Sequence, residues 1–179
     1  RLGIATMAIC PVMVSVSMAA INSLIRQVSL RADYDFLTHV YSRSGLYEAL
    51  KHEETHRHTR FLTVMLLDID YFKSINDNYG HECGDRVLAS FARQVQQVVG
   101  EDGMVARMGG EEFAVVVNSG DAQHGFELAE RIRSTVASHP FTWRHQTLYL
   151  TVSIGLGSGK AESWQLTEVF NKLMAEADD

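Results

Sequence analysis

A near-continuous apolar run, Phe61–Leu67, lies in the first half of the chain. Such a run is typical of a central strand that is covered on both faces of a sheet. It ends at Asp68-Ile69-Asp70, where the pattern becomes acidic. Because alternate side chains of an extended segment share a face, we predict that Asp68 and Asp70 point the same way, with the Ile69 carbonyl between them.

Two further apolar runs flank a glycine turn. Met104–Ala106 and Phe113–Val117 are predicted strands, and Gly109-Gly110 between them predicts a hairpin, since glycine accepts positive φ and lets another backbone or a ligand come close. Glu111 and Glu112 then lie at the hairpin tip. An isolated turn of this kind is usually exposed and its acids solvated. The acidic end of the preceding strand instead favours a shared Mg²⁺ site built from oxygen ligands.

Four other stretches are predicted helices: residues 44–50, which Ser44 would cap, and residues 85–99, 121–138 and 163–177. Residues 71–85 are expected to form a polar loop. Residues 141–144 and 147–155 are predicted to form a hairpin whose second arm continues toward another core strand. The residues predicted to face inward from 121–138 are Phe126, Leu128, Ala129, Ile132 and Val136.

The predicted loop carries a second set of candidate residues. Its amides near Phe72 and Lys73 could hold phosphate oxygens, as amides at a helix start do. Asn76 offers a donor and an acceptor, and Asp85 accepts two N–H groups, so both suit the reading of a base. Helix capping or an Asx-turn is the structural alternative for each of these two residues.

The N-terminal residues 2–25 carry no charge, and about 20 such residues are enough to cross a bilayer as a helix. We therefore predict a transmembrane helix over residues 1–25, with a buried helix of a soluble domain as the alternative. Arg26 and Arg31 follow it, so the positive-inside rule puts the rest of the chain on the cytoplasmic side of the inner membrane. Residues 26–34 are a predicted helical connector. Residues 35–179 are a predicted catalytic domain whose C-terminal end is missing, because no helix stop signal precedes Asp179.

Composition narrows the choice of partners. The 179 residues are 46% apolar, which is enough for one full core. The net charge of −6 and the lack of a Lys/Arg stripe argue against a nucleic-acid partner, so an anionic ligand would need metal ions or local donors. Cys10 and Cys83 have neither metal-ligand nor disulfide spacing. His52, His56 and His58 could bind a metal, but the cationic residues beside them favour a solvated helix end.

With these residues in view, the sequence resembles the GGDEF family of diguanylate cyclases over residues 35–179. The agreement in order and spacing includes a long motif and is highly specific. The matching motifs are Asp35-x-Leu-Thr, Asp68-Ile-Asp-x-Phe-Lys-x-Ile-Asn-Asp-x-x-Gly-His-x-x-Gly-Asp85, Arg107-x-Gly-Gly-Glu-Glu-Phe113, Thr151-Val-Ser-Ile-Gly155 and Ala177-Asp178.

The resemblance implies a palm-like nucleotidyl cyclase domain of the α/β (α+β) class, with a central mixed or antiparallel sheet flanked by helices. It implies that Asp68, the Ile69 carbonyl and Glu111 ligate Mg²⁺, or Mn²⁺ in its place, and that Glu112 is a second acidic contributor. The residues implied to bind substrate are Asn76 and Asp85 for guanine, Phe72 and Lys73 for phosphates, and Gly109 and Gly110 at the turn.

The reaction implied by the resemblance joins two GTP molecules into cyclic di-GMP and releases two pyrophosphates. Each domain would bind one GTP, so two copies must face each other in a homodimer. Glu111 or bound water would accept the proton of the attacking hydroxyl. A catalytically silent GTP-binding signalling module is the alternative function, and a cyclase that also takes ATP is a third.

The sequence departs from the family pattern at a few positions. His39 stands where the family usually has Gly and Ser42 where it usually has Asn; we expect both to be tolerated. The family's inhibitory product site, Arg-x-x-Asp, corresponds to Gly100-Glu-Asp-Gly103, so tight product inhibition is predicted to be absent. The phosphate-binding Lys and Arg of the family follow the Ala-Asp motif, beyond Asp179.

Overall fold

The computed structural model describes residues 18, 20–24, 33–53, 59–101, 103–162 and 166–178. The chain divides into two units, residues 1–32 and 33–179. Among the described residues, no helix combines the length and the apolar character needed to cross a membrane. Most residues of the predicted span over 1–25 and of the connector over 26–34 lie outside the described residues, and both stay predictions. Tyr34, at the end of that connector, is not helical, because it forms a β-bridge with Tyr41.

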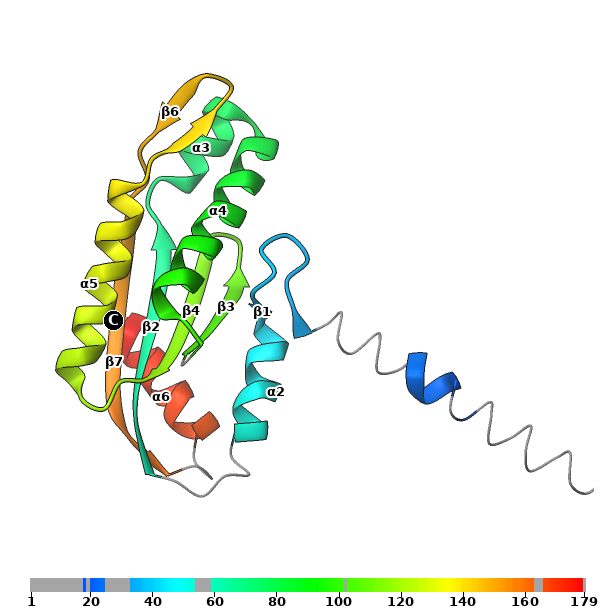
Figure 1. Cartoon of the computed structure of the whole chain (residues 1–179), viewed down its shortest axis with the longest axis vertical. Helices are drawn as coiled ribbons and strands as arrows, with labels where there is room; N and C mark the ends of the chain where they lie inside the picture. The colour runs from blue at the N-terminus through cyan, green and yellow to red at the C-terminus, as the bar shows by residue number, and fades with distance from the viewer. Residues whose placement is uncertain are drawn as a thin grey trace, which may run out of the picture. The chain divides into compact units, whose positions relative to one another are not determined.

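The second unit is built on a five-stranded mixed sheet with the strand order β1-β3-β4-β2-β7 (Figure 1). β2 (Thr59–Ile69) lies between β4 (Glu112–Asn118) and β7 (Val152–Glu162) and is antiparallel to both. β3 (Gly103–Gly109) pairs with β4 in an antiparallel hairpin, and the short β1 (Tyr41–Ser42) is parallel to β3. The predicted central strand and the predicted glycine hairpin are therefore confirmed.

Helices cover both faces of this sheet. α4 (His81–Val99) and α5 (Ala122–Ser138) pack on one face, whereas α2 (Arg43–Glu53) and α6 (Leu166–Asp178) pack on the other (Figure 1). The two faces follow from the alternation of side chains along β2, since Met65 and Leu67 point to the first core and Leu62 and Val64 to the second. The result is the predicted α+β arrangement.

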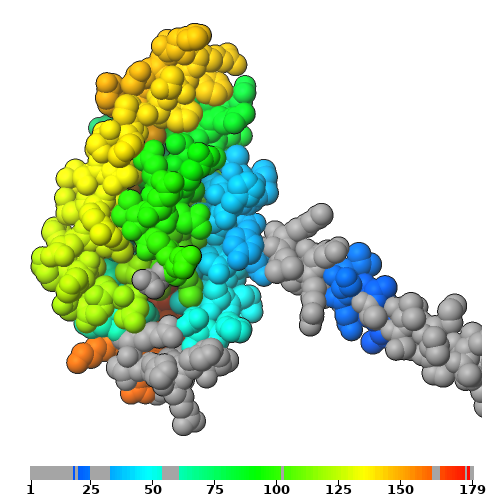
Figure 2. Space-filling model, viewed as in Figure 1, coloured from blue at the N-terminus to red at the C-terminus, as the bar shows by residue number. Residues whose placement is uncertain are grey.

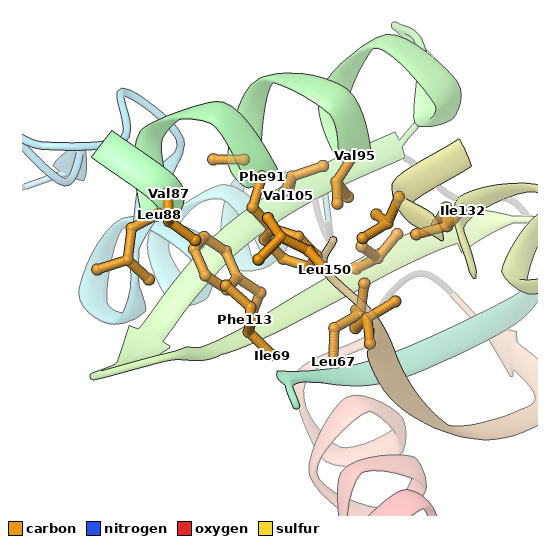
Figure 3. Close-up of a cluster of buried hydrophobic side chains, with 14 of the residues drawn as sticks. Leu67, Ile69, Val87, Leu88, Phe91, Val95, Val105, Phe113, Ile132 and Leu150 are labelled. Carbon is orange, nitrogen blue, oxygen red and sulfur yellow. The ribbon is translucent and has the colours of Figure 1, made fainter. Parts of the chain in front are cut away.

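The core under α4 is the one that supports the candidate site. Figure 3 shows Val87 and Phe91 of α4 above Leu67, Ile69 and Phe113 of the sheet. The rings of Phe91 and Phe113 meet edge to face, with centroids 5.0 Å apart. In the space-filling view α5, α4 and the segment leading into α2 follow one another across one face (Figure 2). The strand ends that carry the acidic residues are thus fixed to a tightly packed core.

The stretch predicted as a polar loop is largely helical. Residues Phe72–Tyr79 form the helix α3, and α4 begins at His81, four residues before the predicted start. Phe72 and Ile75, three residues apart on α3, are buried in the first core, so packing rather than overall polarity decides the local structure. Gly80, at φ 86°, separates the two helices in a conformation that glycine adopts without strain.

The predicted second arm over residues 147–155 is divided in two. β5 (Phe141–Trp143) and β6 (Gln146–Leu148) form a separate two-stranded sheet, and β7 starts only at Val152. Leu148 and Leu150 are buried in the first core, which explains why the chain leaves the small hairpin there. The last helix begins at Leu166 among the described residues, within the predicted range.

Two predictions about helix details are wrong. The cap of α2 is Ser42 and not Ser44, because the Ser42 hydroxyl accepts a hydrogen bond from the Gly45 amide at 3.1 Å. Phe126 of α5 does not face inward, since the residue is 51% exposed. α5 instead approaches the sheet through Gly125, which lies against Thr63 of β2 and leaves no room there for a side chain.

Candidate active site

The two acidic elements meet at one end of the sheet. In the register of β2 and β4, Asp68 lies opposite Glu112, and Glu111 is in the adjoining turn. The pKa of Asp68 is raised, first by partial burial and then by the negative charges of Glu111, Glu112 and Asp70. A cation would relieve this repulsion, so the predicted juxtaposition of Asp68 with the hairpin carboxylates is confirmed and its chemistry suits a divalent metal ion.

The fit to a metal ion depends on more than side chains. Among the described residues, no group of three His, Cys, Asp or Glu side chains could by itself hold a metal ion. The predicted set has two carboxylates, those of Asp68 and Glu111, together with the Ile69 carbonyl. Mg²⁺ commonly takes few protein ligands and fills its coordination with water and substrate phosphates, and this sparse set of hard oxygens is consistent with that habit.

The β3–β4 turn is held in place by a side chain on its own strand. Gly110 has a φ of 47°, which favours glycine, and the ladder shifts register between Arg107 and Gly109. The Arg107 Nε donates to the Gly110 carbonyl at 2.9 Å, and its Nη1 lies 3.3 Å from both carboxylate oxygens of Asp35. The Arg107 and Asp35 side chains are only 17% and 16% exposed. Arg107 therefore connects the turn to the segment that leads into the domain.

Asp35 is itself fixed by the turn that follows it. Its carboxylate accepts hydrogen bonds from the Thr38 amide at 2.9 Å and the Thr38 hydroxyl at 2.7 Å. Burial alone would raise the pKa of Asp35, but the hydrogen bonds from Thr38 and the charge of Arg107 outweigh it, and the pKa is lowered. The motif Asp35-x-Leu-Thr thus supplies an ionised carboxylate that holds Arg107.

Asp70 is tied to the neighbouring strand. Its carboxylate accepts hydrogen bonds from the hydroxyls of Thr151 and Ser153, each at 2.6 Å, and its amide donates to the Thr151 carbonyl at 3.0 Å. β2 ends at Ile69, so Asp70 lies beyond the segment in which side chains alternate. The strand pattern therefore does not decide its direction, and its hydrogen bonds join the end of β2 to the start of β7.

The predicted base-reading residues lie on two helices, and neither caps a helix. Asn76 is inside α3 and Asp85 is the fifth residue of α4, so the capping alternative is wrong for both. Within the described part of the chain, neither side chain has a hydrogen bond or an ion pair. Asn76 is partly buried and Asp85 is exposed. Both polar groups are thus available to a ligand.

The predicted phosphate-binding amides open α3. Phe72 and Lys73 are its first two residues, and Tyr71 before them provides no side-chain cap. The N–H groups of a helix's first turn have no acceptor within the helix. Phe72 buries its ring while the Lys73 side chain is exposed, so this end of the helix can present N–H groups and a cation to an anion.

A cavity of about 290 Å³ adjoins the acidic residues on the α6 side of the sheet. It is lined by Asp68, Glu112 and Ser153, together with Gly155 and Ala177. A larger cavity, of about 730 Å³, lies along α5 and contains none of the predicted site residues. The chemistry of the lining, rather than the volume, identifies the smaller cavity as part of the candidate site.

Comparison with known proteins agrees with this geometry. A family model described as "Diguanylate cyclase, GGDEF domain" matches residues 32–179. The chain belongs to the GGDEF family. It is 69% identical over 178 residues to a protein named probable diguanylate cyclase DgcF in Escherichia coli (strain K12), and the alignment covers 99% of this chain but 56% of that relative. The alignment with the corresponding protein of Escherichia coli O157:H7 covers 38% of that relative. The chain therefore spans roughly half or less of these relatives.

Solved structures of GGDEF proteins have the same fold. The diguanylate cyclase SiaD of Pseudomonas aeruginosa, solved with its activator SiaC, has a TM-score of 0.72 at 27% identity, covering 99% of this chain and 70% of SiaD. The coiled coil and GGDEF domain of DgcB from Caulobacter crescentus, solved with c-di-GMP, also gives 0.72, at 25% identity and with 93% and 91% of the two chains covered.

Two departures of this GGDEF domain now have a structural explanation. His39 adopts a φ of 60°, a left-handed conformation in which glycine is unstrained, which accounts for the family's usual glycine. Ser42 caps α2, and asparagine, the usual residue there, is an equally good cap.

The positions of the family's inhibitory product site include Gly100 and Gly103, which line a cavity of about 470 Å³ together with Tyr34 and Tyr41. The absence of tight product inhibition in this GGDEF domain stays a prediction.

The sequence motifs that contain Asp35 and Arg107 do not by themselves reveal that these residues hold the turn. Asp35 and Arg107 are 72 positions apart, and Asp70 and Thr151 are 81 apart. The only signal in the sequence was that both members of each pair fell within matched motifs. A half-buried arginine and a carboxylate become recognisable partners only when the fold brings them together.

Proposed function

We propose that this GGDEF domain is the catalytic domain of a diguanylate cyclase that condenses two GTP molecules into cyclic di-GMP and two pyrophosphates. The observation that carries the proposal is the meeting of Asp68 with Glu111 and Glu112 beside two helices that present Asn76 and Asp85, whose side chains have no hydrogen bond or ion pair to any residue that the structure describes. Relatives that are named diguanylate cyclases support the same activity.

In this proposal, different residues of the site bind the base, the phosphates and the metal ion. Asn76 and Asp85 bind guanine, whereas the first amides of α3 and Lys73 bind phosphate oxygens. The turn glycines Gly109 and Gly110 carry no side chains, so a nucleotide can approach the backbone there. Asp68, Glu111 and the Ile69 carbonyl would hold Mg²⁺ or Mn²⁺, which when bound activates the attacking hydroxyl and neutralises charge on the leaving pyrophosphate.

In each step of the reaction one bond forms and one bond breaks within the pair of GTP molecules. The 3′-oxygen of one GTP forms a bond to the α-phosphorus of the other, and the bond from that phosphorus to the oxygen bridging to the β-phosphate breaks. Glu111 or water accepts the hydroxyl proton, and pyrophosphate leaves. The same step in the opposite direction closes the ring. Because one domain binds one GTP, the reaction needs two copies face to face, and catalysis consists largely of bringing the two substrates together.

We also propose that residues 1–25 anchor the protein in the inner membrane, with the domain over 35–179 in the cytoplasm. The uncharged stretch followed by Arg26 and Arg31 supports this orientation. Fractionation of cells that produce the full-length protein tests it. Recovery in the membrane fraction after a high-salt wash is expected, whereas recovery in the soluble fraction would contradict the anchor.

The function is tested by incubating the full-length protein with GTP and Mg²⁺ and resolving the products by chromatography. We expect a cyclic dinucleotide, formed at a rate that rises faster than linearly with protein concentration. Replacing GTP by ATP should yield little product, whereas equal use of both would favour the cyclase of mixed substrate. Intact GTP that nevertheless raises the melting temperature would favour the silent signalling module.

A further inference from the structure

Gly84, the fourth residue of α4, lies directly against the side chain of Asn76. A Cβ atom at Gly84 would overlap the Asn76 side-chain oxygen and would come within 3.2 Å of the Phe72 Cζ. Gly84 is buried and has an ordinary helical backbone, so no positive φ calls for glycine here. Glycine inside a helix is less stable than alanine. The absence of a side chain therefore serves the close approach of α3.

The position of Asn76 depends on this contact. Its amide has no hydrogen-bond partner among the residues that the structure describes, so packing alone sets where it points. The bare backbone of Gly84 lies against the Asn76 amide and also against the ring of Phe72, and the next residue of α4 is Asp85. The same glycine thus seats one base-reading group and precedes the other along the helix.

We propose that Gly84 determines base specificity by positioning Asn76 beside Asp85. The inference rests on the proposed function, because it takes guanine to be the base that these two residues read. Any side chain at position 84 pushes the Asn76 amide away from the base and leaves the phosphate-binding amides of α3 in place. Guanine recognition is then lost selectively, while the contribution of the triphosphate to binding remains.

The chain offers a matched control in Gly125. This residue is also a buried helical glycine, and a Cβ there would likewise overlap a side-chain oxygen, that of Thr63. Thr63 lies in the middle of β2 and bonds to the hydroxyls of Ser119 and Ser158, away from the candidate site. Gly125→Ala should therefore lower stability through the same kind of overlap without changing base preference.

The experiment measures the dissociation constants of non-hydrolysable GTP and ATP analogues for the protein and its variants, with the melting temperature alongside. Gly84→Ala should reduce the preference for the GTP analogue by about tenfold or more, the scale of one lost base-reading contact, while ATP binding changes little. Gly125→Ala should keep the wild-type preference. In an Asn76→Ala background, Gly84→Ala should cause no further loss, because the group that it displaces is already absent.

The outcomes separate the two proposals. A wild-type protein without preference for the GTP analogue would overturn the proposed function and this inference with it. A wild-type preference that survives in Gly84→Ala would overturn only the inference, as would a further loss when Gly84→Ala is added to Asn76→Ala. If Gly84→Ala alone fails to fold, the double variant regains the space of the amide, and its preference must equal that of Asn76→Ala.

Discussion

At the acidic end of the site, the β3–β4 turn is held by directional polar contacts, from Arg107 to Gly110 and from Arg107 to Asp35. At the base-reading end, α3 rests on α4 through Phe72 and the bare backbone of Gly84, and Asn76 has no polar partner in the described part of the chain. Carboxylates that repel one another need fixed hydrogen bonds to stay together, whereas an uncharged amide can be placed by packing. Substitutions at the acidic end and at the base-reading end should therefore have different effects on turnover, stability and nucleotide selectivity.

Replacement of the hairpin carboxylate should have the largest effect. Glu111→Gln is expected to lower turnover more than about a hundredfold while the fold is retained, because a neutral amide is a poor Mg²⁺ ligand. The measurement is the rate of product formation at saturating GTP, with circular dichroism as the control for folding. Retained activity would remove Glu111 from the metal site.

Loss of the arginine that braces the turn should come next. Arg107→Ala leaves the Gly110 carbonyl and the Asp35 carboxylate without their donor, so we expect a loss of about 1–3 kcal/mol in the free energy of unfolding and roughly 10–100-fold in turnover. Denaturant unfolding and product formation provide the two readouts. Arg93→Ala, which removes an exposed arginine of α4, serves as the control. An Arg107→Ala variant as active as that control would show that the turn keeps its position without the hydrogen bonds of Arg107.

The base-reading end should lose selectivity rather than stability. Asp85→Ala is expected to weaken GTP binding by about 1–3 kcal/mol, since a guanine N–H would be left unpaired, with little change in ATP binding or melting temperature. Calorimetric titration with both nucleotides makes the comparison within one protein. Equal losses for GTP and ATP would point to damage to the fold and against base reading by Asp85.

The smallest expected effect is a pH dependence at the acidic end. The pKa of Asp35 in the folded protein is lowered below its ordinary value of 3.8, so its stabilising contribution is present above that pH and is lost as the pH falls through the folded value. The raised pKa of Asp68 acts in the opposite sense, because its protonation on acidification favours the fold.

Unfolding of wild type and Asp35→Asn between about pH 2 and 7 separates these contributions, since Asp68 is common to both proteins. The stability advantage of wild type should be constant near neutral pH and should shrink below about pH 3.8. An advantage that is independent of pH would mean that Asp35 acts through packing and not through its charge.

Local patterns in the sequence were sufficient for β2, the glycine hairpin and α5, because each depends on periodicity or turn chemistry over a few neighbouring residues. They also identified the acidic residues that meet at one end of the sheet. The residue types in the predicted loop also indicated Phe72, Lys73, Asn76 and Asp85 as candidate ligand-binding residues, and the resemblance to the GGDEF family assigned guanine and phosphates to them.

Tertiary packing alone decided the remaining features. α3 has few apolar residues, and Phe72 and Ile75 become a buried pair only because α3 packs onto the first core. The pairing of Arg107 with Asp35 and of Asp70 with Thr151 joins segments far apart in the chain, and no local pattern encodes such distances. A sequence fixes periodicity within an element, but which side chains meet between elements depends on how the finished layers pack.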